Sequence, residues 1–299
     1  MLMNYDYIKG VIVPILTPIN EQEQIDEAKL RKMVNYVISG GVHGILVYGS
    51  NGEFYGVEDE DFERGIRIVM DEAHGRVPVY VGIGSVTTKR CIANARLAAE
   101  CGVNGISLLQ PMFLAPSENE LYRHFETIAG VVPEVPVLLY NNPRVGYGIS
   151  PQLAARLNSE IENIVGIKDS SGDMTTLAEY VRLTRGSDFK VLGGKDTLIF
   201  AALAQGAVGC VATTANFLPN YVADIYNHFV AGAWDSARDA QFRLTPIRKA
   251  LDMSSFPVGT KDIANLMGLD VGNPFLPNLS TSGEQLGKIK SVLIHEGVL

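Results

Sequence analysis

The chain has 299 residues, and 46% of them are hydrophobic, which is enough to bury one large core or two smaller ones. Its formal net charge is −8 and its Lys and Arg residues form no cluster, so neither nucleic acid nor an anionic membrane surface is an expected partner. Pro14 breaks the first apolar run, so no secretory signal or membrane span is readable. The three cysteines lack disulfide or zinc spacing, and we therefore expect a cytoplasmic protein with reduced thiols.

Short apolar runs alternate with amphipathic helical stretches along the chain, as expected for strands alternating with helices. The eight runs cover residues 11–16, 44–49, 77–84, 105–111, 135–141, 164–168, 190–194 and 208–213. Three junctions repeat a pattern in which a helix stops at a glycine shortly before the next strand, at Gly41, Gly102 and Gly206. Their intervals fit two and four units of about 26 to 30 residues, the length of one βα unit.

Eight strands at this period predict a (β/α)8 TIM barrel over residues 1–225. The remaining residues, 226–299, contain only helical patterns and predict a C-terminal helical extension. A doubly wound open sheet is the alternative, but it usually has fewer strands and a glycine-rich phosphate fingerprint after the first one. The sequence has no such fingerprint.

The run that ends at Lys168 raises a question of chemistry. On a regular strand Val165 and Ile167 share one face, while Gly166 and Lys168 share the other. A lysine at a strand end often simply extends into solvent. In a TIM barrel, however, catalytic groups sit at the C-terminal ends of the strands, where Lys168 lies.

Two other strand ends carry polar groups. Gly49, Ser50 and Asn51 follow the second run, where free backbone amides before a helix can hold a carboxylate, although an ordinary turn would have the same composition. Tyr140 ends the fifth run, where a tyrosine is more often a packing residue but can also transfer protons for a neighbouring amine.

The histidines do not suggest a metal site. All five lie in predicted helices or in turns that lead into strands, and none ends a strand at the catalytic side. A metal-dependent aldolase needs converging imidazole or carboxylate ligands. We therefore expect covalent catalysis without a metal or another cofactor.

Six motifs occur in the order found in one enzyme family. They are PILTP (14–18), GSNGE (49–53), LYNNP (139–143), GIKDSSGD (166–173), GGKD (193–196) and GAVGCVATTAN (206–216). Over residues 10 to 280 the chain resembles the dihydrodipicolinate synthase and N-acetylneuraminate lyase family of class I aldolases. The resemblance implies the same barrel with a helical tail, and a homotetramer built as a dimer of dimers.

The resemblance also implies roles for individual residues. Lys168 corresponds to the Schiff-base lysine and Tyr140 to the proton-transferring phenol, and Ser50 is expected to be catalytic with them. Ser50 and Asn51, next to Gly49, also correspond to the binding site for the carboxylate of a 2-oxo acid. The positions that complete the substrate pocket are Gly194, Val211 and Arg144. The implied activity is that of a cofactor-free, Schiff-base-forming lyase, either a class I aldolase that makes or breaks a carbon–carbon bond or a dehydratase that eliminates water, acting through Lys168 on pyruvate or a related 2-oxo acid or sugar acid.

Three departures bear on the substrate. Pro111-Met112-Phe113 stands where the synthase of lysine biosynthesis has a tyrosine pair, so the phenol that crosses the dimer interface is missing and Phe113 cannot relay a proton. Arg144 follows Pro143 directly, in a loop one residue shorter, and Asn51 replaces a hydroxyl residue. These departures favour a sugar-acid or other 2-oxo acid reaction over 4-hydroxy-tetrahydrodipicolinate synthesis, which stays open as the alternative.

Two further hypotheses remain from the sequence. A phosphosugar barrel would hold a phosphate at Gly193, Gly194 and the loop after the eighth strand. A non-catalytic 2-oxo acid binding protein would keep the fold without needing Lys168 or Tyr140.

Overall fold

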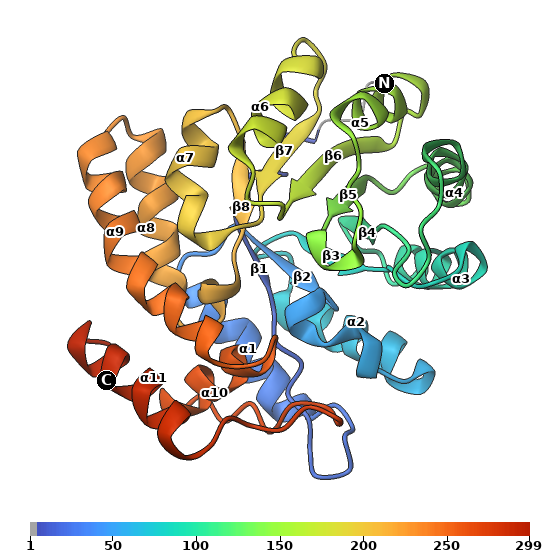
Figure 1. Ribbon diagram of the computed structural model, residues 1–299. Coiled ribbons are helices and arrows are strands. Elements are labelled where there is room, and N and C mark those ends of the chain that lie inside the picture. Colours follow the sequence, from blue (N-terminus) through green and yellow to red (C-terminus); the bar gives the residue numbers. More distant parts are fainter. Residues whose placement is uncertain (1–4) are drawn as a thin grey trace.

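Eight parallel strands pair in sequence order, and β1 pairs with β8 to close them into a barrel (Figure 1). This arrangement comes from a computed structural model that describes residues 5–299. The strands are β1 Gly10–Pro14, β2 Gly44–Val47, β3 Val79–Gly82, β4 Gly105–Leu109, β5 Val137–Asn141, β6 Ile164–Asp169, β7 Lys190–Gly193 and β8 Gly209–Val211. The predicted (β/α)8 TIM barrel is thus confirmed, with all eight strands in the predicted places.

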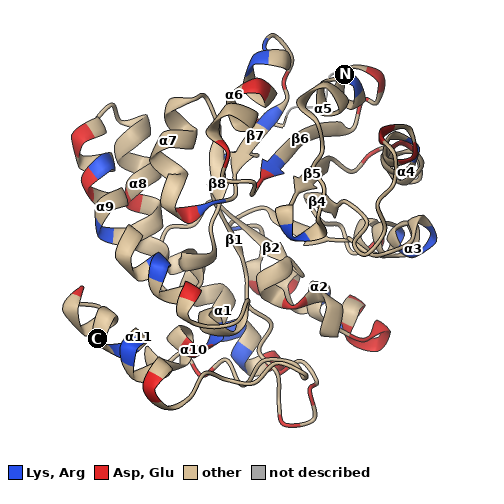
Figure 2. Cartoon of the chain, in the orientation of Figure 1, with Lys and Arg blue, Asp and Glu red and all other residues tan. Residues whose placement is uncertain are grey.

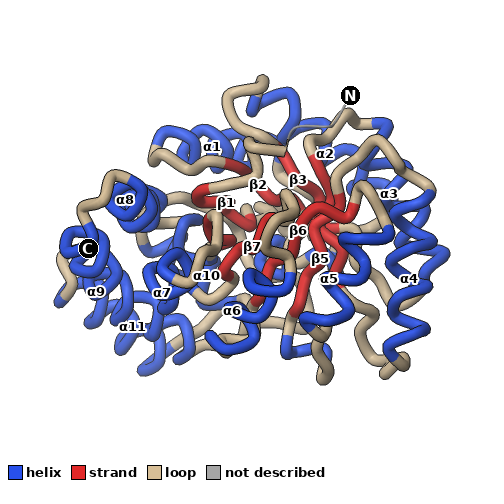
Figure 3. Tube along the Cα trace, turned by 90° about the horizontal axis from the view of Figure 1, so that it is seen from above, coloured by secondary structure: helices blue, strands red, loops and turns tan. Residues whose placement is uncertain are grey.

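Each strand is followed by a helix, and the helices surround the strands (Figure 1, and Figure 3 in a second view). They are α1 Glu27–Ser39, α2 Asp59–Ala73, α3 Thr88–Glu100, α4 Glu118–Gly130, α5 Pro151–Glu160, α6 Met174–Leu183, α7 Ile199–Ala204 and α8 Pro219–Val230. The junction glycines Gly41, Gly102 and Gly206 have φ values of 87°, 73° and 101°. A left-handed backbone favours glycine, which confirms the predicted helix stops.

The buried side chains form two clusters, one inside the barrel and one between the strands and the helices. Every strand residue is buried, and successive side chains alternate between the two sides of the sheet. The inner cluster consists of Tyr5, Ile8, Ile12, Leu46, Tyr80, Leu138, Val165, Leu192 and Val211. These side chains fill the barrel, so its interior is packed and only its ends are open to a substrate.

The predicted alternation along β6 is wrong at one position. Val137 of β5 pairs with Ile164, but the next residue, Leu138, pairs with Gly166, so Val165 is an extra residue in β6. Val165 therefore joins the inner cluster, whereas Ile167 packs in the outer one. Past this irregularity Lys168 pairs with Tyr140 and Leu192 and faces the inside of the barrel.

The C-terminal residues form the predicted helical extension, with α9 Trp234–Ala250, α10 Val258–Leu266 and α11 Gly283–His295. The expected domain boundary between residues 225 and 226 lies inside α8, and the division into two domains stays a prediction. Gln241 of α9 joins the extension to the barrel, because its side chain donates to the carbonyl of Asp196 at 2.9 Å and accepts from the amide of Phe200 at 3.0 Å.

The helix surfaces carry charges of both signs, interspersed along the chain (Figure 2). Among residues 5–299, no helix is both long enough and apolar enough to cross a membrane. The cytoplasmic location stays a prediction.

Candidate active site

Lys168 and Tyr140 lie next to each other at the C-terminal ends of β6 and β5. The two residues pair in register, and the Lys168 Nζ atom lies 3.9 Å from the centre of the Tyr140 ring. The relative exposures are only 5% for Lys168 and 7% for Tyr140. A buried amine beside a phenol is an arrangement in which a nucleophile and a proton carrier can act on the same substrate atom.

The strand sequence explains how this lysine is accommodated. A Cβ atom at Gly166 would lie 2.4 Å from the carbonyl oxygen of Lys190 and 2.7 Å from the Leu138 side chain. Only glycine fits there, two residues before Lys168 on the same side of β6.

The Tyr140 hydroxyl lies within a group of polar side chains. It accepts a hydrogen bond from the Asn142 Nδ2 group at 3.0 Å. Burial raises the pKa of Tyr140, but the charge of Lys168 and hydrogen bonds with Ser50, Ser170 and Lys168 outweigh burial, so that the pKa of this phenol is lowered. A phenol with a lowered pKa exchanges its proton more readily near neutral pH than an ordinary tyrosine does.

The loop of residues 49–53 follows β2 and begins with a short 3-10 helix, Ser50–Gly52. Ser50 and Asn51 are both buried within it. Gly49 and Ser50 share a small recess of about 10 Å³ with Tyr140, while Asn51 lines the main cavity. Ser50 therefore lies beside Tyr140 in the recess, and Asn51 faces the main cavity, which Lys168 also lines.

The main cavity at the barrel mouth has a volume of about 370 Å³. Six residues predicted from the sequence line it: Asn51, Tyr140, Arg144, Lys168, Gly194 and Val211. Side chains that the sequence did not single out for this site also line it, among them Ser170, Thr213, Arg248 and Phe256. The structure thus brings the predicted residues together, with Gly49 and Ser50 beside them in the recess.

Two arginines reach the cavity from different parts of the chain. Arg144 follows β5, and its guanidinium lies 3.8 Å from the centre of the Phe256 ring. Arg248 belongs to α9; its side chain is 12% exposed and its Nη1 atom lies 2.9 Å from the Asp252 carboxylate. Nothing in the sequence near Arg248 marked it as a site residue, because only the packing of the extension against the barrel brings it there.

Backbone amides that follow β7 and β8 already donate hydrogen bonds to acceptors within the protein. The Gly194 amide donates to the carbonyl of Asp169 at 2.7 Å, and the Asp196 carboxylate accepts from the amides of Thr213 and Thr214 at 3.2 and 2.7 Å. These amides are occupied, which argues against the phosphate site that a phosphosugar enzyme would need here.

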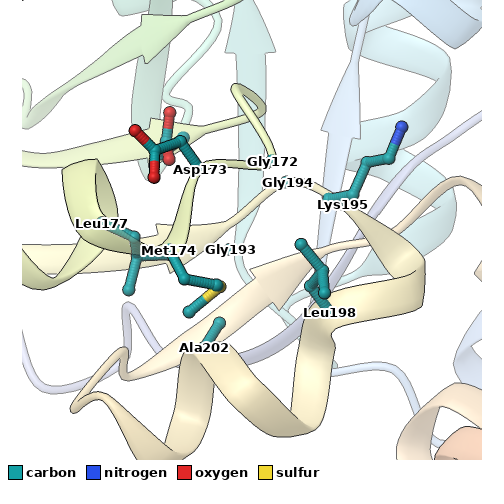
Figure 4. A pocket seen from close by; sticks show the side chains of 10 residues that line it. Gly172, Asp173, Met174, Leu177, Gly193, Gly194, Lys195, Leu198 and Ala202 are labelled. Carbon is teal, nitrogen blue, oxygen red and sulfur yellow. The ribbon is translucent and has the colours of Figure 1, made fainter.

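Lys195 also lines the main cavity. Gly194 and Lys195 also line a second, small cavity of about 10 Å³, which has room for about one water. The side chain of Lys195 extends away from the apolar wall of this small cavity, which Met174, Leu177 and Leu198 form (Figure 4).

Within residues 5–299, no group of three or more His, Cys, Asp or Glu side chains is arranged to hold a metal ion.

The comparison with protein-family models decides the family. Residues 7–296 match the model of the dihydrodipicolinate synthetase family. The chain belongs to this family. A curated 4-hydroxy-tetrahydrodipicolinate synthase of Thermus thermophilus is 37% identical over 262 residues, which cover 87% of each chain. The synthase of Methanospirillum hungatei is 32% identical and aligns over 95% of this chain and 98% of its own.

Solved structures of the dihydrodipicolinate synthetase family agree with the fold. A dihydrodipicolinate synthase of Bacillus anthracis is 36% identical, with a TM-score of 0.91 over 96% of this chain and 97% of that one. A prophage protein of the family from E. coli K12, solved in complex with pyruvate, is 27% identical, with a TM-score of 0.93 over 98% of this chain and 99% of that one. The protein is accordingly an enzyme of the lyase type found in this family.

The segment after β4 exposes large apolar side chains to solvent. Phe113 is 94% exposed and has a φ of 70°, and Leu114 is 48% exposed. Met112 lines a separate cavity with Phe54, Tyr55 and Val86. Phe113 therefore presents its aromatic ring to solvent from a left-handed backbone, next to other apolar side chains.

Proposed function

We propose that this enzyme is a class I aldolase that forms an imine between Lys168 and pyruvate or a related 2-oxo acid. The observation that carries the proposal is the Lys168 amine, buried in the barrel mouth and held against Tyr140 in a cavity large enough for a small acid. The neutral amine adds to the ketone carbon, and loss of one water gives the iminium.

Tyr140 moves the protons that these steps require. In our proposal its phenol relays a proton from the added amine to the new oxygen and then gives its own proton, so that this oxygen leaves as water, while Ser50 and Asn142 hold the phenol in place. The resulting phenolate takes a proton from the carbon next to the iminium, which gives an enamine and restores the phenol. The enamine attacks an aldehyde and forms the new carbon–carbon bond, the phenol protonates the resulting alkoxide, and hydrolysis of the product iminium returns the Lys168 amine and the phenol proton.

The 49–53 loop is our candidate for the site of the 2-oxo acid carboxylate, with Ser50 and Asn51 as its polar groups. Gly194 and Val211 would complete the pocket around the bound acid. This assignment is supported by the position of Asn51 in the cavity that also contains Lys168.

The arginines point to the chemistry of the second substrate. The cavity contains Lys195, Arg144 and Arg248 in addition to Lys168, whereas the protein as a whole carries a net charge of −8. Guanidinium groups bind carboxylates well. We propose that Arg144 and Arg248 bind a carboxylate on the aldehyde partner.

Synthesis of 4-hydroxy-tetrahydrodipicolinate is the second candidate. It is favoured by relatives of that name at 31–37% identity. Phe113, which lacks a phenol, favours instead a reaction with another aldehyde or a sugar acid. In either case we propose a homotetramer, a dimer of dimers in which Phe113 lies between subunits.

Borohydride trapping tests the central proposal. Incubation with pyruvate and borohydride should add a pyruvate-derived group to one peptide, the one containing residues 163–173. Lys168→Ala should abolish the label, and Lys195→Ala should keep it. A label elsewhere, or no label with any 2-oxo acid, contradicts the assignment.

A second assay separates the two acceptors. The enzyme is supplied with pyruvate and a panel of aldehydes with and without a carboxylate, and the products are identified by mass. Formation of 4-hydroxy-tetrahydrodipicolinate at a higher kcat/KM than any other product would support the second candidate.

A further inference from the structure

Two neighbouring residues of the C-terminal extension reach the 49–53 loop. Thr260 and Lys261 lie in α10, about 200 residues away in sequence, and their relative exposures are 2% and 1%. Each contacts a different residue of the loop. The extension is therefore part of the wall that supports the proposed carboxylate site.

Thr260 fixes the side chain of Asn51. Its hydroxyl donates to the Asn51 Oδ1 atom at 3.2 Å, and the Asn51 Nδ2 group donates to the Thr213 hydroxyl at 2.9 Å. Both ends of the amide have a partner, so the amide has one preferred orientation. Thr213 is itself held by Asp196, which connects Asn51 to the ends of β7 and β8.

Lys261 and Glu53 form an ion pair that is closed off from solvent. The Lys261 Nζ atom lies 2.6 Å from the Glu53 Oε2 atom, and the two side chains are 1% and 0% exposed. Glu53 also accepts from the Phe275 amide at 3.0 Å, and Lys261 donates to the Asn273 carbonyl at 2.8 Å. Every charge in the pair therefore has additional hydrogen bonds.

Such a pair is poorly explained by stability alone. A buried ion pair often contributes no more than a well-packed apolar pair would, because both charges lose their hydration. What it does provide is a fixed position for the backbone. Glu53 has a φ of 50°, a left-handed conformation that is unfavourable for a residue other than glycine.

We infer that α10 of the C-terminal extension positions the 49–53 loop for 2-oxo acid binding, with Thr260 orienting Asn51 and Lys261 holding Glu53 in its left-handed turn. The inference rests on the proposed function of this loop. Neither residue lines the cavity. Both are positioning residues that act through Asn51 and Glu53.

The test uses Thr260→Val, which keeps the shape of the side chain and removes the hydroxyl. Loss of one hydrogen bond should raise the KM for pyruvate by about three- to tenfold. At saturating pyruvate, borohydride trapping on Lys168 should remain complete. Thr260→Ser restores the hydroxyl and should bring the KM back to within about twofold of the wild type.

The ion pair is tested with the double variant Glu53→Gln and Lys261→Met, because either change alone would leave a buried charge unpaired and risk unfolding. The glutamine side chain can still accept from the Phe275 amide. We expect a folded protein by circular dichroism with a raised pyruvate KM. If the double variant does not fold, the comparison of Thr260→Val with Thr260→Ser decides whether the inference stands.

The outcomes separate this inference from the proposed function. If the wild type traps pyruvate on Lys168 but Thr260→Val keeps the wild-type KM, the positioning role is wrong and the proposed function stands. If a raised KM of Thr260→Val is not corrected in Thr260→Ser, the hydroxyl is not the cause and the inference also fails. If the wild type traps nothing, the proposed function itself fails.

Discussion

Replacement of Tyr140 by phenylalanine separates the two roles of its side chain. The ring remains, so the contact with Lys168 at 3.9 Å and the packing of the barrel mouth are kept. The hydroxyl is lost, and with it the hydrogen-bond acceptor of Asn142 at 3.0 Å and the partner of Ser50. The variant thus removes the proton carrier with little change of shape.

The expected effect on rate is large and the effect on stability small. Proton transfer by a positioned side chain contributes typically a hundred- to ten-thousandfold, so we expect kcat to fall by at least about a hundredfold, or about 2.7 kcal/mol of activation free energy. The Asn142 amide loses its partner in a buried site, which should lower the free energy of unfolding by about 1–3 kcal/mol.

Steady-state kinetics and urea unfolding measure the two quantities, and Tyr180→Phe is the matched control. Tyr180 is a buried tyrosine like Tyr140, but its hydroxyl donates to the carbonyl of Ile149 and its ring lies in the outer cluster, away from the cavity. It should lose stability and keep its kcat. If Tyr140→Phe retains kcat within tenfold of the wild type, Tyr140 is not the proton carrier.

Four further predictions concern other parts of the chain. Arg248→Met should raise the KM for a carboxylate-bearing aldehyde by about ten- to a hundredfold without affecting pyruvate trapping; an equal effect on an uncharged aldehyde would contradict the assignment. EDTA should leave turnover unchanged, and loss of activity restored by zinc or magnesium would count against the imine mechanism. Sedimentation at micromolar concentration should show an oligomer that Phe113→Asp converts to smaller species, and a wild-type monomer would refute the interface. Burial lowers the pKa of His124 to about 4, so the unfolded chain binds a proton below pH 6.5 that the folded protein excludes. This one group should therefore lower the free energy of unfolding by about 3 kcal/mol between pH 7 and pH 4, and in urea titrations His124→Gln should show a fall that is smaller than that of the wild type by about this amount.

The barrel could be predicted from the sequence because its signals are local. Each strand is a short buried run, and the helices before Gly41, Gly102 and Gly206 end where a left-handed residue is needed. The one error, at Val165, has a local cause as well. A strict two-residue alternation cannot anticipate an extra residue in β6, which depends on the partner strand.

The site could be predicted only in part, and the reason is the distance in sequence between its components. Lys168 and Tyr140 stand at strand ends, which a barrel brings to one face by its topology alone. Arg248, Phe256 and Thr260 reach the site only because the extension packs against the barrel mouth. Their own segments contain no pattern that marks such contacts.

In our proposal the residues at the strand ends carry the chemistry, whereas residues outside the strands select the second substrate. In our proposal an imine needs an amine and a proton carrier, and both come from strands whose spacing the barrel fixes. The groups facing a second substrate, Arg144 and Arg248, come from a loop and from α9, which can change without disturbing the strands. Family membership therefore constrains the reaction class more tightly than the acceptor, and in our proposal the choice of acceptor depends on the contact between the β5 loop and the extension, where Arg144 stacks on Phe256.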